Sequence, residues 1–143
     1  MHHEVTVEIN APRETVWALL EDVERWPEMT ASIKRVERLT EGPFGEGSRA
    51  RVHQPGLPAA VWTVTDFAPG RAFTWTARTP GVTTVASHDI TSHPDGTVSV
   101  RLGLDQSGPL AFLVALLAGR RARRYVAMEA AGLKQKAELQ QTK

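Results

Sequence analysis

His88 is the side chain of this sequence best suited to move a proton near neutral pH. It lies in the segment VASHDITS, where its neighbours at a spacing of two are Ala86 and Ile90. Because alternate residues of a strand face the same side, this pattern predicts that His88 points into the protein. Burial would lower the pKa of the imidazole and keep it neutral, which suits a general base. His88 is therefore our catalytic candidate, and a buried histidine that only satisfies a hydrogen bond is the alternative.

Other patterns for catalysis or metal binding are missing from the sequence. The chain holds no cysteine, which excludes disulfides, thiolate nucleophiles and cysteine-bound zinc together. It has no G-x-S-x-G nucleophile motif, no P-loop and no G-x-G-x-x-G. Beyond the first three residues, no His-x₃-His or His-x-His pair occurs, and no carboxylates cluster beside His88 in the sequence. We therefore predict neither a metal site nor a cofactor.

A cluster of four arginines follows the apolar run LAFLVALLA; its members are Arg120, Arg121, Arg123 and Arg124. These residues form the solvated side of a core helix in one interpretation, with their stems over apolar surface. In the other, the segment touches anionic lipid or RNA, as interfacial helices do. Arg121 falls between Leu117 and Tyr125 at helical spacing, so we expect it at the rim of an internal cavity, where it could hold an acidic headgroup.

The elements that must position these residues begin with a strand and a helix. Residues 4–10 alternate between apolar and polar side chains and predict a half-buried strand. Pro12 suits the first position of a helix whose apolar face recurs through residue 23. Asp22 can cap a second short helical turn that ends near Trp26 and Pro27, because proline does not allow one helix to continue smoothly.

The middle of the chain predicts strands alone, joined by turns rich in glycine and proline. Strands are expected at residues 33–39, 49–54, 60–67, 73–78, 82–91 and 97–106, and HPDG predicts a hairpin between the last two. Short turns without intervening helices favour an antiparallel sheet. One long helix from Leu110 to about Gln140 closes the chain. The expected class is α+β.

The segment NAPRETVWALLEDVERWPEM resembles the opening of the START-like superfamily, also called SRPBCC or Bet v 1-like. The segments PFGEGSRARVHQPG and VWTVTDFAPGRAFTWTA are similar to its bacterial polyketide cyclase/dehydrase-type branch. The resemblance covers residues 5–138. It implies a helix-grip fold, in which a curved seven-stranded antiparallel sheet surrounds a long C-terminal helix and two short helices follow the first strand. It also implies an apolar cavity between sheet and helix.

Apolar residues of the sheet and the last helix are the candidates for lining this cavity. Besides Arg121, the predicted ligand-binding residues are Trp62, Phe73, Trp75, Leu113, Leu117, Tyr125 and Met128. Buried aromatic and methionine side chains commonly line apolar ligand sites, although each of these residues could equally fill a solid core. In an enzyme, Tyr125 and Arg121 would be proton donors across from His88.

Three functions fit the resemblance. The first is binding of a small hydrophobic molecule, such as a lipid, a polyketide or an aromatic compound. The second is a polyketide cyclase or dehydrase, and the third is a protein-interaction module. Length and composition predict one domain over residues 1–143, and a net charge of +1 gives no reason to expect nucleic acid as a partner. The longest apolar run is about half of the ~20 residues that cross a bilayer, so no stable membrane insertion is expected. We expect a cytoplasmic protein and leave a homodimer open.

Overall fold

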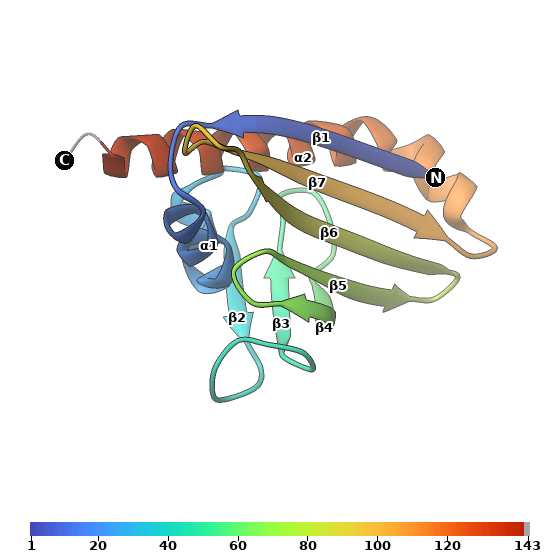
Figure 1. Ribbon diagram of the computed structural model, residues 1–143. Helices are drawn as coiled ribbons and strands as arrows, with labels where there is room; N and C mark the ends of the chain where they lie inside the picture. The colour runs from blue at the N-terminus through green and yellow to red at the C-terminus, as the bar shows by residue number, and fades with distance from the viewer. Residues whose placement is uncertain (142–143) are drawn as a thin grey trace.

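The computed structural model describes residues 1–141 and consists of one sheet, two short helices and one long helix (Figure 1). In chain order the elements are β1 (His2–Ile9), α1 (Arg13–Glu21), the 3₁₀ helix η1 (Val23–Glu28), β2 (Arg35–Arg38), β3 (Arg49–His53), β4 (Ala60–Ala68), β5 (Ala72–Thr79), β6 (Val82–Ser92), β7 (Val98–Ser107) and α2 (Ala111–Gln141). The seven strands form a single sheet in the order β1-β7-β6-β5-β4-β3-β2. Every neighbouring pair is antiparallel, and the helix-grip prediction is confirmed.

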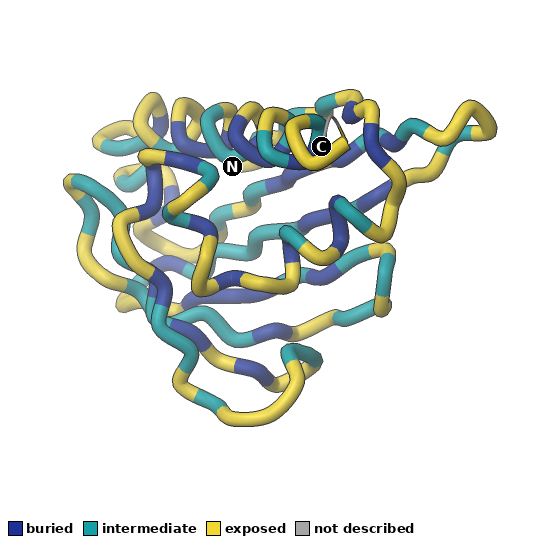
Figure 2. Tube along the Cα trace, turned by 90° about the vertical axis from the view of Figure 1, so that its left-hand side faces the viewer, coloured by how far each residue is buried: buried dark blue, intermediate teal, exposed yellow. Residues whose placement is uncertain are grey.

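One face of the sheet is buried, because buried and exposed side chains alternate along each strand. Along β7, Val98, Val100 and Leu102 are buried, whereas Arg101 between them is exposed. Figure 2 shows the same alternation of buried and exposed segments along the strands and along the helix above them. A register shift between Val64 and Asp66 interrupts the pairing of β4 with β5, and such bulges bend a sheet. The buried face is therefore the wall against which the helices pack.

Trp26 anchors the elbow between α1 and η1. Its side chain is only 4% exposed, and its indole N–H donates to the carbonyls of Leu19 and Leu20 at 3.2 and 3.1 Å. Its ring lies 5.2 Å from that of Trp75 and 5.5 Å from that of His88. The elbow thus closes one end of the space between sheet and helix.

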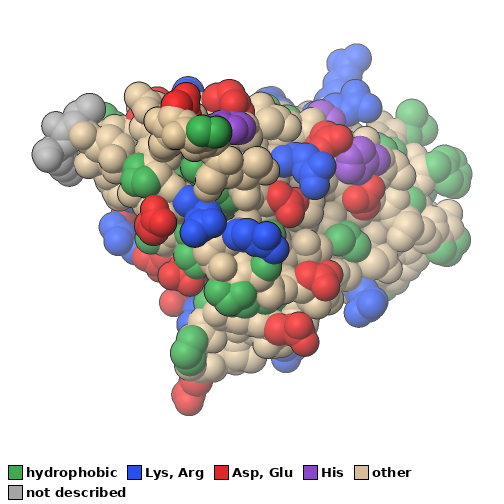
Figure 3. Space-filling model, viewed as in Figure 1, with side chains coloured by type: hydrophobic (Ala, Val, Ile, Leu, Met, Phe, Trp, Pro, Cys, Tyr) green, Lys and Arg blue, Asp and Glu red, His purple; other side chains and the backbone are tan. Residues whose placement is uncertain are grey.

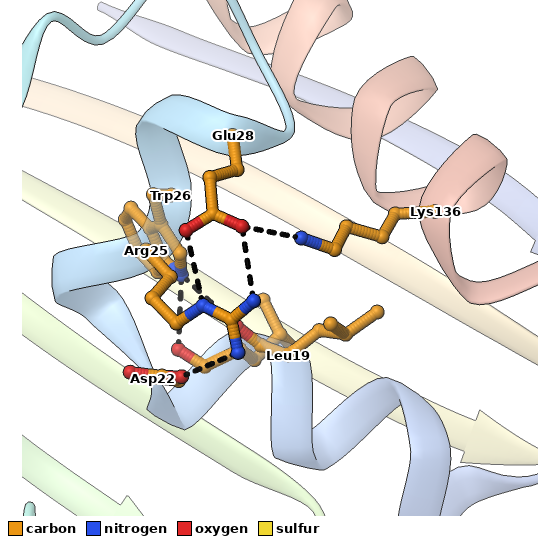
Figure 4. A network of polar contacts seen from close by, with 7 residues as sticks. Leu19, Asp22, Arg25, Trp26, Glu28 and Lys136 are labelled. Carbon is orange, nitrogen blue, oxygen red and sulfur yellow. Dashed lines mark hydrogen bonds and ion pairs between the residues drawn. The ribbon is translucent and has the colours of Figure 1, made fainter. Parts of the chain in front are cut away.

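A polar network on the outside of the elbow ties it to α2 (Figure 4). Arg25 donates two hydrogen bonds to Glu28, both at 3.0 Å, and Lys136 of α2 reaches the same carboxylate at 3.0 Å. Hydrogen bonds from Arg25 and then Lys136 hold the pKa of Glu28 down at about 2. Gly132 lets α2 approach closely, because a Cβ there would lie 2.0 Å from the Met29 carbonyl oxygen.

Two local predictions were wrong at the helix ends. Pro12 precedes α1 in an extended conformation, and the helix begins at Arg13. Asp22 stands before η1 but makes no capping hydrogen bond, because its carboxylate turns to Arg25 at 3.8 Å. The predicted strand at 33–39 is shorter, since it comprises only Arg35–Arg38.

Candidate functional site

A cavity of about 230 Å³ lies between the sheet and α2 and is partly open to solvent. Strands β3 to β7 contribute one side of its wall, and Ala122, Tyr125, Val126 and Glu129 of α2 contribute the other. These helical residues recur at i, i+3, i+4 and i+7, so they form one face of α2. The wall is mainly apolar, and the site is an internal pocket of the kind that receives small molecules.

Three tryptophans form the aromatic part of the wall: Trp26, Trp62 and Trp75. Trp75 is buried, and Trp62 beside it lies at 5.7 Å between ring centroids. Trp26 meets Trp75 edge-on from the elbow. Because the three come from η1, β4 and β5, the sheet and the elbow together fix their positions. They offer flat apolar surfaces against which a ring or an acyl chain can pack.

His88 stands at the inner end of the cavity, on the strand face predicted from its neighbours. Its Nδ1 lies 3.1 Å from the carbonyl oxygen of Phe73. A carbonyl cannot donate, so Nδ1 carries the proton of the neutral imidazole and Nε2 keeps its lone pair. Burial lowers the pKa of His88 to about 4, against a smaller opposing effect of the Phe73 carbonyl. Among residues 1–141, no hydrogen bond reaches Nε2.

Glu129 is the functional candidate that the sequence analysis missed. It lies on α2 and lines both the main cavity and a smaller one beside it, and His88 lines the same two cavities. The residue is half-buried. Within the described chain, no hydrogen bond or ion pair holds its carboxyl. Burial alone raises the pKa of Glu129 to about 7. Its signal in the sequence was a carboxylate four residues from both Tyr125 and Leu133, within an apolar stripe.

The outer end of the cavity lies between the ends of the strands and the loop that joins β3 to β4. At this end, Thr84 of β6 pairs with Ala77 of β5 and with Gln106 of β7. Thr84 faces the cavity like Ala86 and His88, which follow it on β6 at a spacing of two. Leu57 and Pro58 of the loop complete the rim.

Two hydrogen bonds fasten this loop to α2. The Tyr125 hydroxyl donates to the Pro55 carbonyl at 2.5 Å, and Arg121 Nη1 donates to the Gly56 carbonyl at 2.8 Å. Gly56 has a φ of +75°, and a Cβ there would lie 2.6 Å from Arg121 Nη1. The positive φ therefore favours glycine at this position, and a larger residue would also displace the guanidinium of Arg121.

The structure places only some of the predicted site residues in the wall of the cavity. Trp62, Trp75, His88 and Tyr125 line the cavity. Phe73 is fully buried behind His88, and Met128 lies outside the wall. Arg121 also lies outside it, because its guanidinium holds the loop.

The predicted positions of Leu113 and Leu117 were wrong. Both are exposed, at 40% and 77%, whereas Ala111 and Gly119 are the buried residues of the same turns of α2. Gln106 lines the cavity near its outer end, and its Oε1 is buried without a hydrogen-bond partner in the described chain.

Metal chemistry finds no support in the described part of the chain. Residues 1–141 contain no group of three or more His, Cys, Asp or Glu side chains arranged to hold a metal ion. The polar groups of the cavity are instead suited to hydrogen bonding and proton transfer.

A sheet closed by an elbow and one long helix, with a cavity between them, defines a START-like helix-grip protein. The chain belongs to the polyketide cyclase / dehydrase and lipid transport family, whose model matches residues 1–138.

Solved structures share the fold at low sequence identity. A hypothetical protein from Helicobacter pylori is 14% identical, with a TM-score of 0.79 and coverage of 95% of this chain and 86% of that one. The Zhui aromatase/cyclase from Streptomyces sp. R1128 is 24% identical, with a TM-score of 0.73 and coverage of 96% and 93%. A START superfamily protein from Mycobacterium smegmatis is 19% identical, with a TM-score of 0.72 and coverage of 94% and 97%. No curated protein matches the sequence.

Proposed function

We propose that this protein binds a small, mainly apolar molecule whose polar end meets His88 and Glu129 at the inner end of the cavity. The observation that carries the proposal is the pairing of an aromatic wall with two polar groups without partners, His88 Nε2 and the Glu129 carboxyl, which line the same two cavities. Burying a polar group without a partner is costly, so a ligand that supplies one gains both affinity and orientation.

The chemistry of the two groups narrows the class of ligand. Nε2 of His88 only accepts a hydrogen bond while the ring is neutral. Glu129 accepts when ionised and both donates and accepts when protonated, and a pKa of about 7 makes both forms available near neutral pH. A hydroxylated aromatic or a hydroxylated acyl chain satisfies both groups, whereas a plain hydrocarbon satisfies neither.

A pair of matched probes tests this proposal. Titration calorimetry with 2-naphthol and with naphthalene compares the same apolar body with and without a hydroxyl group. We expect 2-naphthol to bind more tightly, and Ala86→Phe, which fills the cavity from β6, to remove binding of both. Ala59→Phe, on the exposed part of the β3–β4 loop, is the control and should leave binding intact. Equal affinity for the two probes would contradict the role given to His88 and Glu129.

A second candidate function is dehydration of a β-hydroxy ketone, which the same two groups favour. Nε2 of His88 would take a proton from the carbon between carbonyl and hydroxyl. Protonated Glu129 would donate its proton to the departing hydroxyl, so that a carbon–carbon double bond and water form. A pKa near 7 leaves a large fraction of Glu129 protonated for this step.

Turnover distinguishes this enzyme from a binding protein. A β-hydroxy ketone with an aromatic body is incubated with the wild type, His88→Gln and Glu129→Gln, and the conjugated product is followed by absorbance. Loss of product in both variants with binding retained supports catalysis. Product formation by none of the three leaves ligand binding as the function toward that compound.

A further inference from the structure

The first turns of α2 have their large and small side chains in an unusual arrangement. Phe112, Leu116 and Leu117 are 74–77% exposed, and Leu110 and Leu113 are 45% and 40% exposed. The buried residues of the same turns are small, namely Ala111 and Gly119. Surface helices of globular proteins normally bury their large apolar residues against the core. We call Leu110, Phe112, Leu113, Leu116 and Leu117 the apolar patch.

The arginine cluster continues the same face of the helix. Phe112, Leu116, Arg120 and Arg124 are each four residues apart, and Leu113, Leu117 and Arg121 form a second row with the same spacing. Residues four apart lie one above the other on a helix. Two turns of apolar side chains are therefore followed directly by two turns of arginine. Hydrophobic side chains gather at the right-hand end of Figure 3, where α2 begins in Figure 1.

The charge of this face is not balanced within the protein. No Asp or Glu occurs between Asp105 and Glu129, and in the described chain no carboxylate forms an ion pair with Arg120, Arg121, Arg123 or Arg124. A second copy meeting this face about a two-fold axis would bring more arginines and no acidic residue from it. An anionic lipid surface supplies both an apolar layer for the patch and negative charge for the arginines.

We propose that the first four turns of α2 dock the protein on the surface of an anionic lipid bilayer. The apolar patch would enter the boundary between headgroups and acyl chains, and the arginines would contact lipid phosphates. This is contact with one leaflet, because no helix within residues 1–141 is long and apolar enough to cross a membrane. The patch also adjoins the outer end of the cavity, since Ala122 and Tyr125 of the wall follow on the same helix.

Vesicle sedimentation measures the docking directly and does not require a cavity ligand. We expect the wild type to sediment with vesicles of phosphatidylglycerol and phosphatidylcholine, less with pure phosphatidylcholine, and less again at high salt. Arg120→Gln with Arg123→Gln should weaken binding roughly 25-fold, from about fivefold for each arginine near an anionic surface. Arg13→Gln with Arg49→Gln removes the same charge elsewhere and should change binding little.

The apolar part of the contact is tested in the same assay. Leu116→Ser with Leu117→Ser should weaken binding by at least about tenfold, because two exposed leucines lose their insertion into lipid. Leu39→Ser with Leu139→Ser is the control pair of exposed leucines away from the patch. Unchanged thermal unfolding would show that the variants are folded, as expected for exposed positions.

A labelled protein gives an independent readout. Because the chain has no cysteine, Leu116→Cys can carry a single environment-sensitive fluorophore, with Leu39→Cys as control. A blue shift on anionic vesicles at position 116 alone supports the proposal. Three results would overturn it: no sedimentation of the wild type, sedimentation unaffected by the patch variants, or a dimer in solution that Leu116→Ser with Leu117→Ser dissociates. The last would assign the face to a second copy of the chain.

Discussion

The imidazole of His88 stacks on the ring of Phe73, with centroids 4.2 Å apart and planes 13° apart, and also hydrogen-bonds to the Phe73 carbonyl. The two residues are direct partners on β6 and β5, so the register of the sheet creates both contacts. The stack covers one face of the imidazole, and the hydrogen bond fixes its tautomer. Only Nε2 remains available to a ligand. His88 is therefore a neutral hydrogen-bond acceptor that is held in one orientation.

This arrangement predicts that His88 lowers stability in acid. Its pKa is about 4 in the folded protein and ordinarily 6.5, so between these values the unfolded chain binds the proton and the folded protein does not. The contribution of the neutral imidazole to the free energy of unfolding is fully present above about pH 6.5 and is lost as the pH falls toward 4. It amounts to something on the order of 3 kcal/mol. Urea unfolding at pH 7 and pH 4 should show a smaller loss of stability for His88→Gln than for the wild type, and His3→Gln, on the edge strand β1, is the control.

The raised pKa of Glu129 predicts an effect on stability with the opposite dependence on pH. Its pKa is raised from 4.5 to about 7, so ionisation is unfavourable in the fold and its cost grows as the pH rises through 7. Glu129→Gln should therefore be more stable than the wild type at pH 8, by roughly 2–3 kcal/mol, and similar to it near pH 4.5. Glu28→Gln is a matched control with the opposite sign, because it loses contacts with Arg25 and Lys136. Equal stability of Glu129→Gln and the wild type at pH 8 would contradict the burial assigned to this carboxyl.

Trp26 should be essential to the fold, because it fills the elbow and makes hydrogen bonds there. Trp26→Ala should reduce the free energy of unfolding by roughly 3–5 kcal/mol. Trp62→Ala should cost less, since Trp62 is half-buried and already borders open space, but it should weaken binding of 2-naphthol. Denaturant unfolding and calorimetry separate the two effects. A change below about 0.5 kcal/mol for Trp26→Ala would contradict its role as an anchor.

The strands and the inward direction of His88 could be predicted because they depend on a period of two. In a strand, the faces of Ala86, His88 and Ile90 follow from local sequence alone, and the structure confirms them. The short β2 was harder to predict, since residues 33–39 follow neither helical nor strand spacing.

The start of α2 could not be predicted in the same way. The run LAFLVALLA is apolar on every side of a helix, so its pattern does not select an inward face. Leu113 and Leu117 were assigned inward because helical spacing places them on one broad side with Tyr125, whereas the buried residues of these turns are Ala111 and Gly119. Glu129 was missed for a related reason. A carboxylate is normally solvated, and only the position of the helix over the sheet shows that this one faces a cavity.

The loop between β3 and β4 should control access to the cavity. Tyr125 and Arg121 fasten it through the carbonyls of Pro55 and Gly56, and Leu57 forms part of the rim. Tyr125→Phe removes one hydrogen bond and keeps the ring in the wall, at a cost of about 0.5–1.5 kcal/mol. Gly56→Ala opposes a φ of +75° and places a Cβ within 2.6 Å of Arg121 Nη1, so it should strain the loop and displace the guanidinium that holds it.

We expect both variants to exchange the amide hydrogens of residues 54–59 faster and to release 2-naphthol faster than the wild type. Gly70→Ala, in the turn between β4 and β5, is the control: it has a similar φ of +79° but nothing within 4 Å of its Cβ. It should strain its own turn and leave ligand release unchanged. If Gly56→Ala and Gly70→Ala affect release equally, general destabilisation accounts for the change. If Tyr125→Phe alone has no effect, Arg121 is sufficient to hold the loop.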